Sequence, residues 1–164
     1  MRQPAPTLHL LCGKIASGKS SLAAALTSEA QTVLISEDQL LSDLYPGEID
    51  TLEAFRDASA RLRKAIAPHI VQMLASGLSV VLDFQANTPG SRKWMKGLVD
   101  ASGAAHKLHW LRASDKTCKR RLAARNVAGT HEYQVSEQEF DLFTSYFVEP
   151  GADEGFIVAV HEQD

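Results

Sequence analysis

The sequence predicts a three-layer α/β fold, in which helices cover both faces of a parallel sheet. Two observations support this class: short apolar runs recur along the chain, and helical stretches of about ten or more residues separate them. Runs that are apolar throughout are typical of parallel strands buried on both faces. At 164 residues, with 45% apolar and 23% charged residues, the chain has the size and composition of one globular domain, which we expect to span residues 1–164.

Five short apolar runs are expected to form the strands: Thr7–Cys12, Thr32–Ser36, 79–84, 106–112 and 155–161. The expected helices between them are, in chain order, 20–30, Glu37–Leu44, 51–76, 91–102 and 114–126. The second helix follows Ser36, a good capping residue, and has acidic residues in its first turn. The third should break or bend at Pro68, because proline lacks the backbone donor that a helix needs.

The segment 13–20 reads GKIASGKS and contains every element of the G-x-x-x-x-G-K-S phosphate loop. It lies directly after a predicted strand and opens a predicted helix, as the motif requires. Gly13 and Gly18 would allow successive N–H groups to point at phosphate oxygens, while Lys19 would reach the β and γ phosphates and Ser20 would bind Mg²⁺. The alternative is a glycine turn that a serine caps. The residues expected to hold ATP here are Gly13, Lys14, Ala16, Ser17, Gly18, Lys19, Ser20 and Ser21.

Carboxylates follow two of the other strands. Asp83 lies in VVLDF, at the carboxyl end of a predicted central strand, where it could support Mg²⁺. The alternative is a strand-terminating Asp that caps the next turn. Glu37 and Asp38 follow the second strand, and a carboxylate there could accept the proton of an attacking hydroxyl. Both could equally belong to an ordinary helix start, and periodicity cannot say which of the two points inward.

A basic helix near residue 120 supplies two further candidates. Arg121 and Arg125 are four residues apart and so share one helix face, where they could clamp phosphates or stack on a base. A solvated basic face is the alternative. The segment 127–143 that follows is polar and contains glycine, as expected of a flap that closes over ATP and keeps water away from the transferred group.

Taken in order, GKIASGKS, LISEDQL, VVLDFQANTPGSRKW and KRRLAARN resemble the P-loop kinases of the adenylate-kinase-like group. The resemblance is greatest to the small AAA-type kinases, with zeta toxins and chloramphenicol phosphotransferase among their relatives. It implies a P-loop NTPase fold with strand order 2-3-1-4-5, acceptor-side helices at about 37–76 and a short helical lid at about 125–149. It also implies ATP and Mg²⁺ as cofactors. The roles it assigns are hydroxyl activation by Asp38, acceptor binding by Asn87 and Arg92, adenine contact by Arg121 and phosphate contact by Arg125.

The predicted function is therefore an ATP-dependent kinase that phosphorylates a hydroxyl of a small molecule. Nucleoside monophosphate kinases carry more arginines in the lid, whereas residues 126–164 contain neither Arg nor Lys. A neutral or hydroxylated small molecule is expected in place of AMP, and the acceptor could be a metabolite, a nucleotide sugar, which the likeness to zeta toxins suggests, or an antibiotic. The alternatives are a 5′-hydroxyl polynucleotide kinase, which the basic helix would favour, and an ATP-dependent switch, which would not need Asp38.

The net charge and the distribution of apolar residues and histidines limit the kinds of partner and ligand that we expect. A net charge of −3 argues against binding a long nucleic acid. The sequence lacks a secretory leader and a membrane-spanning run, so we expect a cytoplasmic protein, acting as a monomer or homodimer, with an antitoxin-like protein partner left open. The histidines suggest no metal site, because His106 and His109 should face opposite sides of their strand and His9, His69 and His161 read as packed or surface residues.

Overall fold

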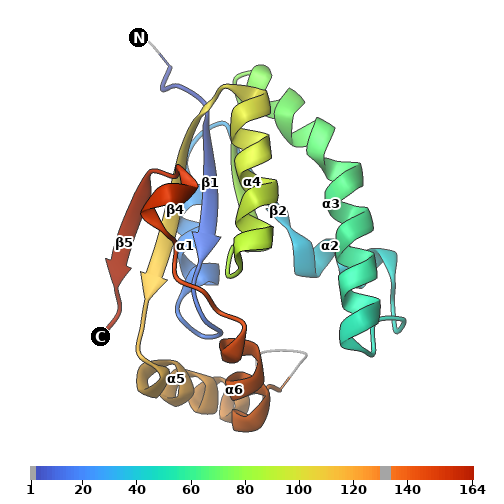
Figure 1. Ribbon diagram of the computed structural model, residues 1–164, viewed down its shortest axis with the longest axis vertical. Coiled ribbons are helices and arrows are strands. Elements are labelled where there is room, and N and C mark those ends of the chain that lie inside the picture. Colours follow the sequence, from blue (N-terminus) through green and yellow to red (C-terminus); the bar gives the residue numbers. More distant parts are fainter. Residues whose placement is uncertain (1–2, 130–133) are drawn as a thin grey trace.

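The computed structural model describes residues 3–129 and 134–164 and confirms the α/β class (Figure 1). Its five strands pair in parallel, in the order β2-β3-β1-β4-β5. Their bounds are β1 Thr7–Cys12, β2 Thr32–Ser36, β3 Ser79–Gln85, β4 Ala105–Arg112 and β5 Val158–Glu162. The strand order that the family resemblance implied is therefore the observed one.

The helices also match the predicted pattern, with small differences at their ends. They are α1 Lys19–Thr27, α2 Glu37–Leu44, α3 Leu52–Ala75, α4 Pro89–Ser102, α5 Asp115–Ala128 and α6 Glu137–Ser145. Each helix from α2 onward begins after a Ser or Thr whose hydroxyl accepts a backbone N–H from the first turn: Ser36, Thr51, Thr88, Ser114 and Ser136. These caps satisfy donors that a helix start leaves unpaired, so they fix the helix starts locally.

Of the break or bend predicted at Pro68, the break does not occur, because α3 continues through this residue without interruption. Figure 1 shows the upper part of α3 inclined to its lower part. Pro68 is exposed, so the carbonyl that loses its partner one turn earlier can bind water instead. The last strand is shorter than predicted and starts at Val158, since Gly155 adopts φ +80° and turns the chain before it enters the sheet.

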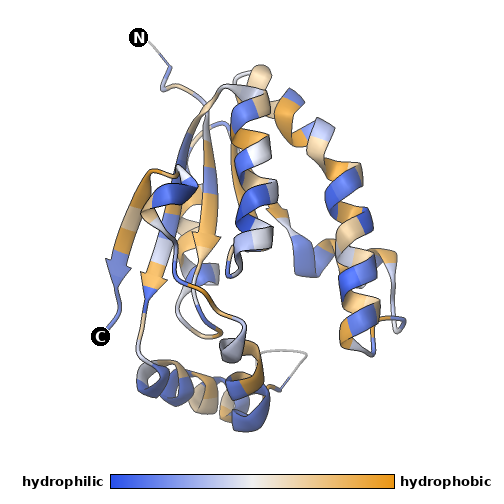
Figure 2. Cartoon of the chain, in the orientation of Figure 1, coloured by the Kyte–Doolittle hydropathy of each residue, from blue (hydrophilic) through white to orange (hydrophobic). Residues whose placement is uncertain are grey.

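The layers pack through apolar faces of the strands, which Figure 2 shows as largely hydrophobic. Leu8, Leu10 and Cys12 of β1 are fully buried in the larger core, which α3 and α4 complete. Leu11 faces the other side, where it packs with Ala23 of α1 and with Val81. The sheet thus has α3 and α4 over one face and α1 over the other (Figure 1).

Helices α5 and α6 lie beyond the carboxyl ends of the strands, at the bottom of Figure 1. Phe140 of α6 is buried against Cys118 and Leu122 of α5, and Ile15 and Ala16 of the 13–18 loop pack on the same cluster. Helix α6 lies within the predicted lid at 125–149, of which residues 130–133 fall outside the described residues. The described part of the lid is therefore anchored on the loop that follows β1.

Candidate functional site

The loop between β1 and α1 has a shape that its glycines permit. Gly18 caps α1 with φ 109°, and Ala16 is also left-handed at φ 62°. A Cβ at Gly13 would lie 2.4 Å from Ser17 Oγ and 3.1 Å from the Leu111 carbonyl, so only glycine fits there. The tight turn delivers the chain into α1, whose first N–H groups have no partners within the helix. Such a concave helix start is an anion-binding site.

Lys19 turns back into this loop. Its ammonium donates hydrogen bonds to the Gly13 carbonyl and, at 2.7 Å, to the Lys14 carbonyl. Burial lowers the pKa of Lys19 to about 8, against the opposing effect of neighbouring groups that include Asp83 and Asp38. A partly desolvated cation inside a ring of backbone groups is well placed to receive an anion.

The two acidic residues after β2 have different environments. Glu37 is buried, with Ser59 Oγ 2.7 Å and Arg63 Nε 3.4 Å from its Oε2 atom. Asp38 is exposed at the same end of the sheet. The structure thus distinguishes two residues that periodicity could not: Glu37 is buried and joins α2 to α3, whereas Asp38 is exposed.

Asp83 pairs in register with Ser36 and lies within β3, two residues before its end. The β1–β3 register shifts at this point, since Leu10 pairs with Leu82 and the next residue, Leu11, pairs with Gln85. Irregular strand positions of this kind re-aim side chains beside active sites. The pKa of Asp83 is raised, first by burial and then by the negative charge of Asp38, although Lys19 opposes both. These three charges therefore gather at the carboxyl ends of the central strands.

Asn87 and Arg92, the two residues expected to bind the acceptor, make hydrogen bonds to other parts of the protein. The Asn87 amide makes two 2.9 Å hydrogen bonds with the Gly13 backbone, accepting from its N–H and donating to its carbonyl. Arg92 is fully buried and donates to Glu154 at 2.8 Å and to the carbonyls of Ala86, Val148 and Glu149. Both side chains thus hold the phosphate loop and the 148–154 segment, and their role in binding the acceptor stays a prediction.

The basic helix does face the loop. Arg121 donates from Nη1 to the Ser17 carbonyl and to Gln163 Oε1, both at 3.2 Å. Arg125, one turn later, is half-buried, and within the described residues its Nε atom has no hydrogen-bond partner. Both arginines therefore lie on the side of α5 that contacts the protein, and the fully solvated alternative is not what the fold adopts.

The remaining loop residues divide by exposure. Lys14 Nζ forms a salt bridge with Asp115 Oδ1 at 2.6 Å, so Lys14 contributes its backbone, and not its side chain, to the phosphate loop. Ser17 is buried, and in the described part of the chain its hydroxyl has no hydrogen-bond partner. Ser20 and Ser21 are exposed at the start of α1. An exposed hydroxyl at Ser20, in the first turn of α1, together with the carboxylate of Asp83 fits the donor set that a phosphate-bound Mg²⁺ takes from a P-loop protein.

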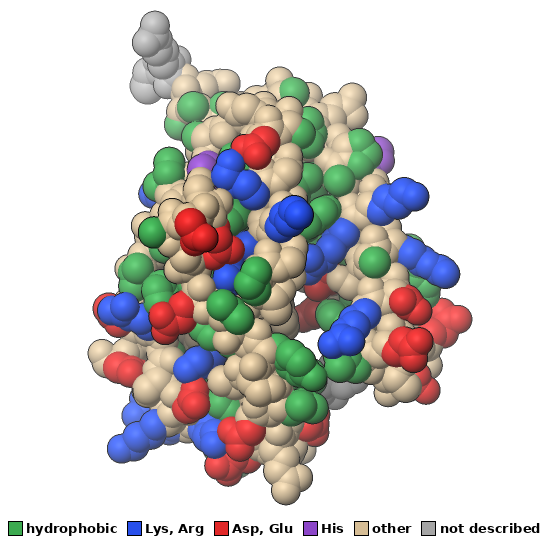
Figure 3. Space-filling view, in the orientation of Figure 1, with side chains coloured by type: hydrophobic (Ala, Val, Ile, Leu, Met, Phe, Trp, Pro, Cys, Tyr) green, Lys and Arg blue, Asp and Glu red, His purple; other side chains and the backbone are tan. Residues whose placement is uncertain are grey.

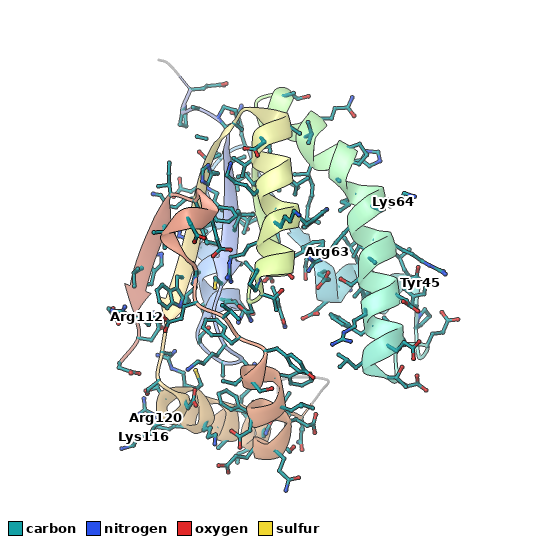
Figure 4. All side chains as sticks on the ribbon, viewed as in Figure 1. Tyr45, Arg63, Lys64, Arg112, Lys116 and Arg120 are labelled. Carbon is teal, nitrogen blue, oxygen red and sulfur yellow. The ribbon has the colours of Figure 1, made fainter. Side chains whose placement is uncertain are left out.

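Sequence reasoning missed two features near the site. Arg63 of α3 lies over the rings of Trp94 and Phe84, with its guanidinium carbon 5.0 Å and 5.8 Å from their centroids. Figure 4 shows Arg63 projecting from α3 toward α4. The surface is hollowed between these two helices, and both basic (blue) and acidic (red) side chains lie in the hollow (Figure 3). Several arginines occur along α3, and their spacing gave no sign of which one turns inward.

The second feature is a row of three imidazoles on adjacent strands. His109 Nε2 lies 3.0 Å from His9 Nδ1, and His109 Nδ1 lies 2.9 Å from His161 Nε2. The pKa of His109 is lowered to about 4, first by burial and then by its two histidine neighbours. His106 points to the other face, where it contacts Phe156. His9 and His161 pack as predicted, but their joint contact with His109 was not foreseen.

Comparisons with known proteins match the whole fold. A family model described as AAA domain (AAA_33) matches residues 8–150. A candidate kinase from Chloroflexus aurantiacus aligns with a TM-score of 0.72 at 20% identity, covering 97% of this chain and 89% of the other. Kti12 from Chaetomium thermophilum, solved with ADP-AlF3, aligns with a TM-score of 0.70 at 16% identity, covering 96% of this chain and 89% of the other.

The APS kinase CysC of Mycobacterium tuberculosis, solved with AMPPNP and APS, aligns with a TM-score of 0.62 at 16% identity, covering 99% of this chain and 92% of the other. At these identities the structural matches establish the P-loop kinase-like fold. A comparison with curated proteins found no significant match. Among the described residues, every helix is too short or too polar to cross a lipid bilayer.

Proposed function

Because this chain belongs to the AAA domain family (AAA_33), we propose that it is a kinase that transfers the γ-phosphoryl group of ATP to a hydroxyl of a small molecule. One observation carries the proposal above the others. A complete phosphate loop, with the Lys19 ammonium inside it, lies at the same strand ends as Asp38, whose carboxylate is exposed. A nucleotide switch needs the loop, whereas only a kinase needs the carboxylate.

The residues of the loop fit a triphosphate. Backbone N–H groups of residues 13–21 would bind phosphate oxygens, and the Lys19 ammonium would leave the loop carbonyls for the β and γ phosphates. Ser20 and Asp83 would hold Mg²⁺, which neutralises phosphate charge when bound. We assign Arg125 to the phosphates, since its buried Nε lacks a partner among the described residues. Arg121 would flank the adenine beside Gln163, its contact in the structure.

Asp38 would act on the acceptor. Its carboxylate accepts the hydroxyl proton as the acceptor oxygen bonds to the γ-phosphorus, and the bond from that phosphorus to the β–γ bridging oxygen breaks to release ADP. Lys19 and Arg125 would stabilise the charge that develops on the phosphoryl oxygens. In this mechanism, positioning of the reactants and electrostatic stabilisation supply most of the rate.

The acceptor is a hydroxylated metabolite, nucleotide sugar or antibiotic. Kinase neighbours support this choice, because they include a gluconokinase and an APS kinase that was solved in complex with AMPPNP and APS. Cytoplasmic location, a monomeric or homodimeric state and an antitoxin-like partner stay predictions. So does the likeness to zeta toxins and chloramphenicol phosphotransferase.

The proposal is tested by offering γ-labelled ATP and a pooled library of metabolites, nucleotide sugars, antibiotics and 5′-hydroxyl oligonucleotides. We expect one class of small molecule to become labelled, and Lys19→Ala to abolish the labelling. Lys116→Ala, an exposed lysine on α5, is the matched control and should label normally. Labelling of oligonucleotides alone would replace this function by polynucleotide phosphorylation, and equal labelling by Lys19→Ala would refute the mechanism.

A further inference from the structure

We propose that Arg63 forms an oxyanion-binding subsite in the acceptor cleft, so that the acceptor is a hydroxylated carboxylate, sulfate or phosphate ester rather than a neutral compound. The inference rests on the proposed kinase function for its biological meaning. The binding event itself can be measured without any turnover, so the two can fail separately.

The side chain of Arg63 is fixed from two sides. Its Nε atom donates to Glu37 Oε2 at 3.4 Å, and its guanidinium carbon lies 5.0 Å from the Trp94 ring centroid. Only 17% of the side chain is exposed. Stacking on an aromatic ring orients the planar guanidinium at little further entropic cost, which prepares it to bind a planar or tetrahedral anion with both terminal nitrogens.

The two terminal nitrogens are the donors available to a ligand. Within residues 3–129 and 134–164, the hydrogen bond that Arg63 makes to protein comes from Nε alone. Arg92 offers the contrast, because the same side-chain type is there fully buried with contacts from all three nitrogens. A guanidinium that is mostly enclosed and keeps both terminal nitrogens outside its protein hydrogen bond can bind an anion.

The charged groups around Arg63 decide whether it can bind an anion in addition to Glu37. The carboxylate facing Arg63 is Glu37, whose Oε2 atom also accepts a shorter, 2.7 Å hydrogen bond from Ser59. Asp38 and Asp83 lie at the neighbouring strand ends and oppose an incoming anion, so its attraction comes from the Arg63 guanidinium itself.

The subsite also has a suitable place relative to the proposed chemistry. Glu37 holds Arg63, and the next residue is Asp38, the carboxylate assigned to the acceptor hydroxyl. A small molecule held by its anionic group at Arg63 can thus present a hydroxyl toward the strand ends. Residues 126–164 contain no Arg or Lys, so in this proposal Arg63 of α3 supplies the positive charge for the acceptor. We therefore expect an anionic acceptor in place of a neutral one.

Trp94 provides a direct reporter. The chain has two tryptophans, so Trp110→Phe leaves Trp94 as the single one. The phosphate loop is first filled with saturating AMPPNP and Mg²⁺, and Trp94 fluorescence is then followed during titration with sodium sulfate or sodium acetate at constant ionic strength. We expect a saturable change, at least tenfold weaker binding in Arg63→Gln, and unchanged binding in the control Arg61→Gln, an exposed arginine of the same helix.

An absence of saturable binding in the Trp110→Phe protein would overturn the inference, whatever the variants do. Equal binding by Arg63→Gln, with a native circular dichroism spectrum, would overturn it as well and leave Arg63 as the partner of Glu37 only. Once an acceptor is known, Arg63→Gln should raise its KM at least tenfold while the KM for ATP stays the same. A labelled acceptor without an anionic group would also refute the inference, and the kinase proposal would stand.

Discussion

Replacing Arg92 with methionine would remove the most extensively bonded side chain in the described structure. Arg92 is fully buried, and its guanidinium donates to Glu154, to the carbonyls of Ala86 and Val148 at 2.9 and 2.8 Å, and more weakly to that of Glu149. Methionine keeps much of the length and all of the apolar stem. The substitution therefore isolates the charge and its hydrogen bonds from the packing.

The expected cost follows from what is left behind. Glu154 keeps a charge with its side chain only 20% exposed, and three carbonyls lose a donor. Removing one partner from a buried ion pair costs about 3–5 kcal/mol, most of it the penalty for the charge that remains. Because domains of this size have a free energy of unfolding of about 5–15 kcal/mol, the variant should still fold with a much reduced margin.

Urea unfolding measures the difference. With a denaturant slope of about 2 kcal/mol per molar, the midpoint should fall by roughly 2 M. Lys93→Met, at the next and exposed position of α4, is the control and should change the free energy of unfolding by less than about 0.5 kcal/mol. If Arg92→Met were as stable as this control yet lost acceptor affinity, Arg92 would act on the acceptor and not through the hydrogen bonds that the structure shows.

Three further predictions use the same structure. Asn87→Ala removes both hydrogen bonds to the Gly13 backbone and should lower the free energy of unfolding by about 2 kcal/mol and weaken ATP binding in calorimetry; unchanged ATP affinity would contradict the role of the amide in shaping the loop. Because burial lowers the pKa of Lys19 to about 8, binding of ATP should restore it and take up protons near pH 8; identical calorimetric enthalpies in buffers of different ionisation heat would argue against this. His109 has a folded-state pKa of about 4, below its unfolded value of 6.5, so the unfolded chain binds more protons between these values and stability should fall as pH drops from about 6.5 toward 4; His109→Asn should reduce that fall in urea midpoints, and a variant with the wild-type slope would show that the imidazole row does not cause it.

Local signals made the phosphate loop and the helix starts predictable. The loop is a contiguous motif, and Ser36 caps α2 through its own hydroxyl, so Glu37–Leu44 has the bounds that the sequence predicted. Pro68 shows the limit of local rules, because an exposed helix face tolerates the missing donor that an enclosed one would not.

The rest depends on partners far along the chain. Which of Glu37 and Asp38 turns inward is decided by Ser59 and Arg63, which lie 22 and 26 residues after Glu37. The histidine row joins strands through pairs that are 100 and 52 residues apart. Neither arrangement leaves a periodic trace, since each needs the sheet order and the helix packing to be in place first.

The central claim is tested most directly by the carboxylate at Asp38. Asp38→Asn and its control Asp43→Asn, another exposed residue of α2, are compared with the wild-type chain for ATP affinity and for transfer of labelled γ-phosphate to the acceptor pool. We predict equal ATP affinity in all three proteins and a transfer rate at least about 100-fold lower in Asp38→Asn alone, as expected for loss of a general base. Transfer by Asp38→Asn at the wild-type rate would contradict the account, and ATP binding without labelling in the wild-type chain would favour a nucleotide switch instead.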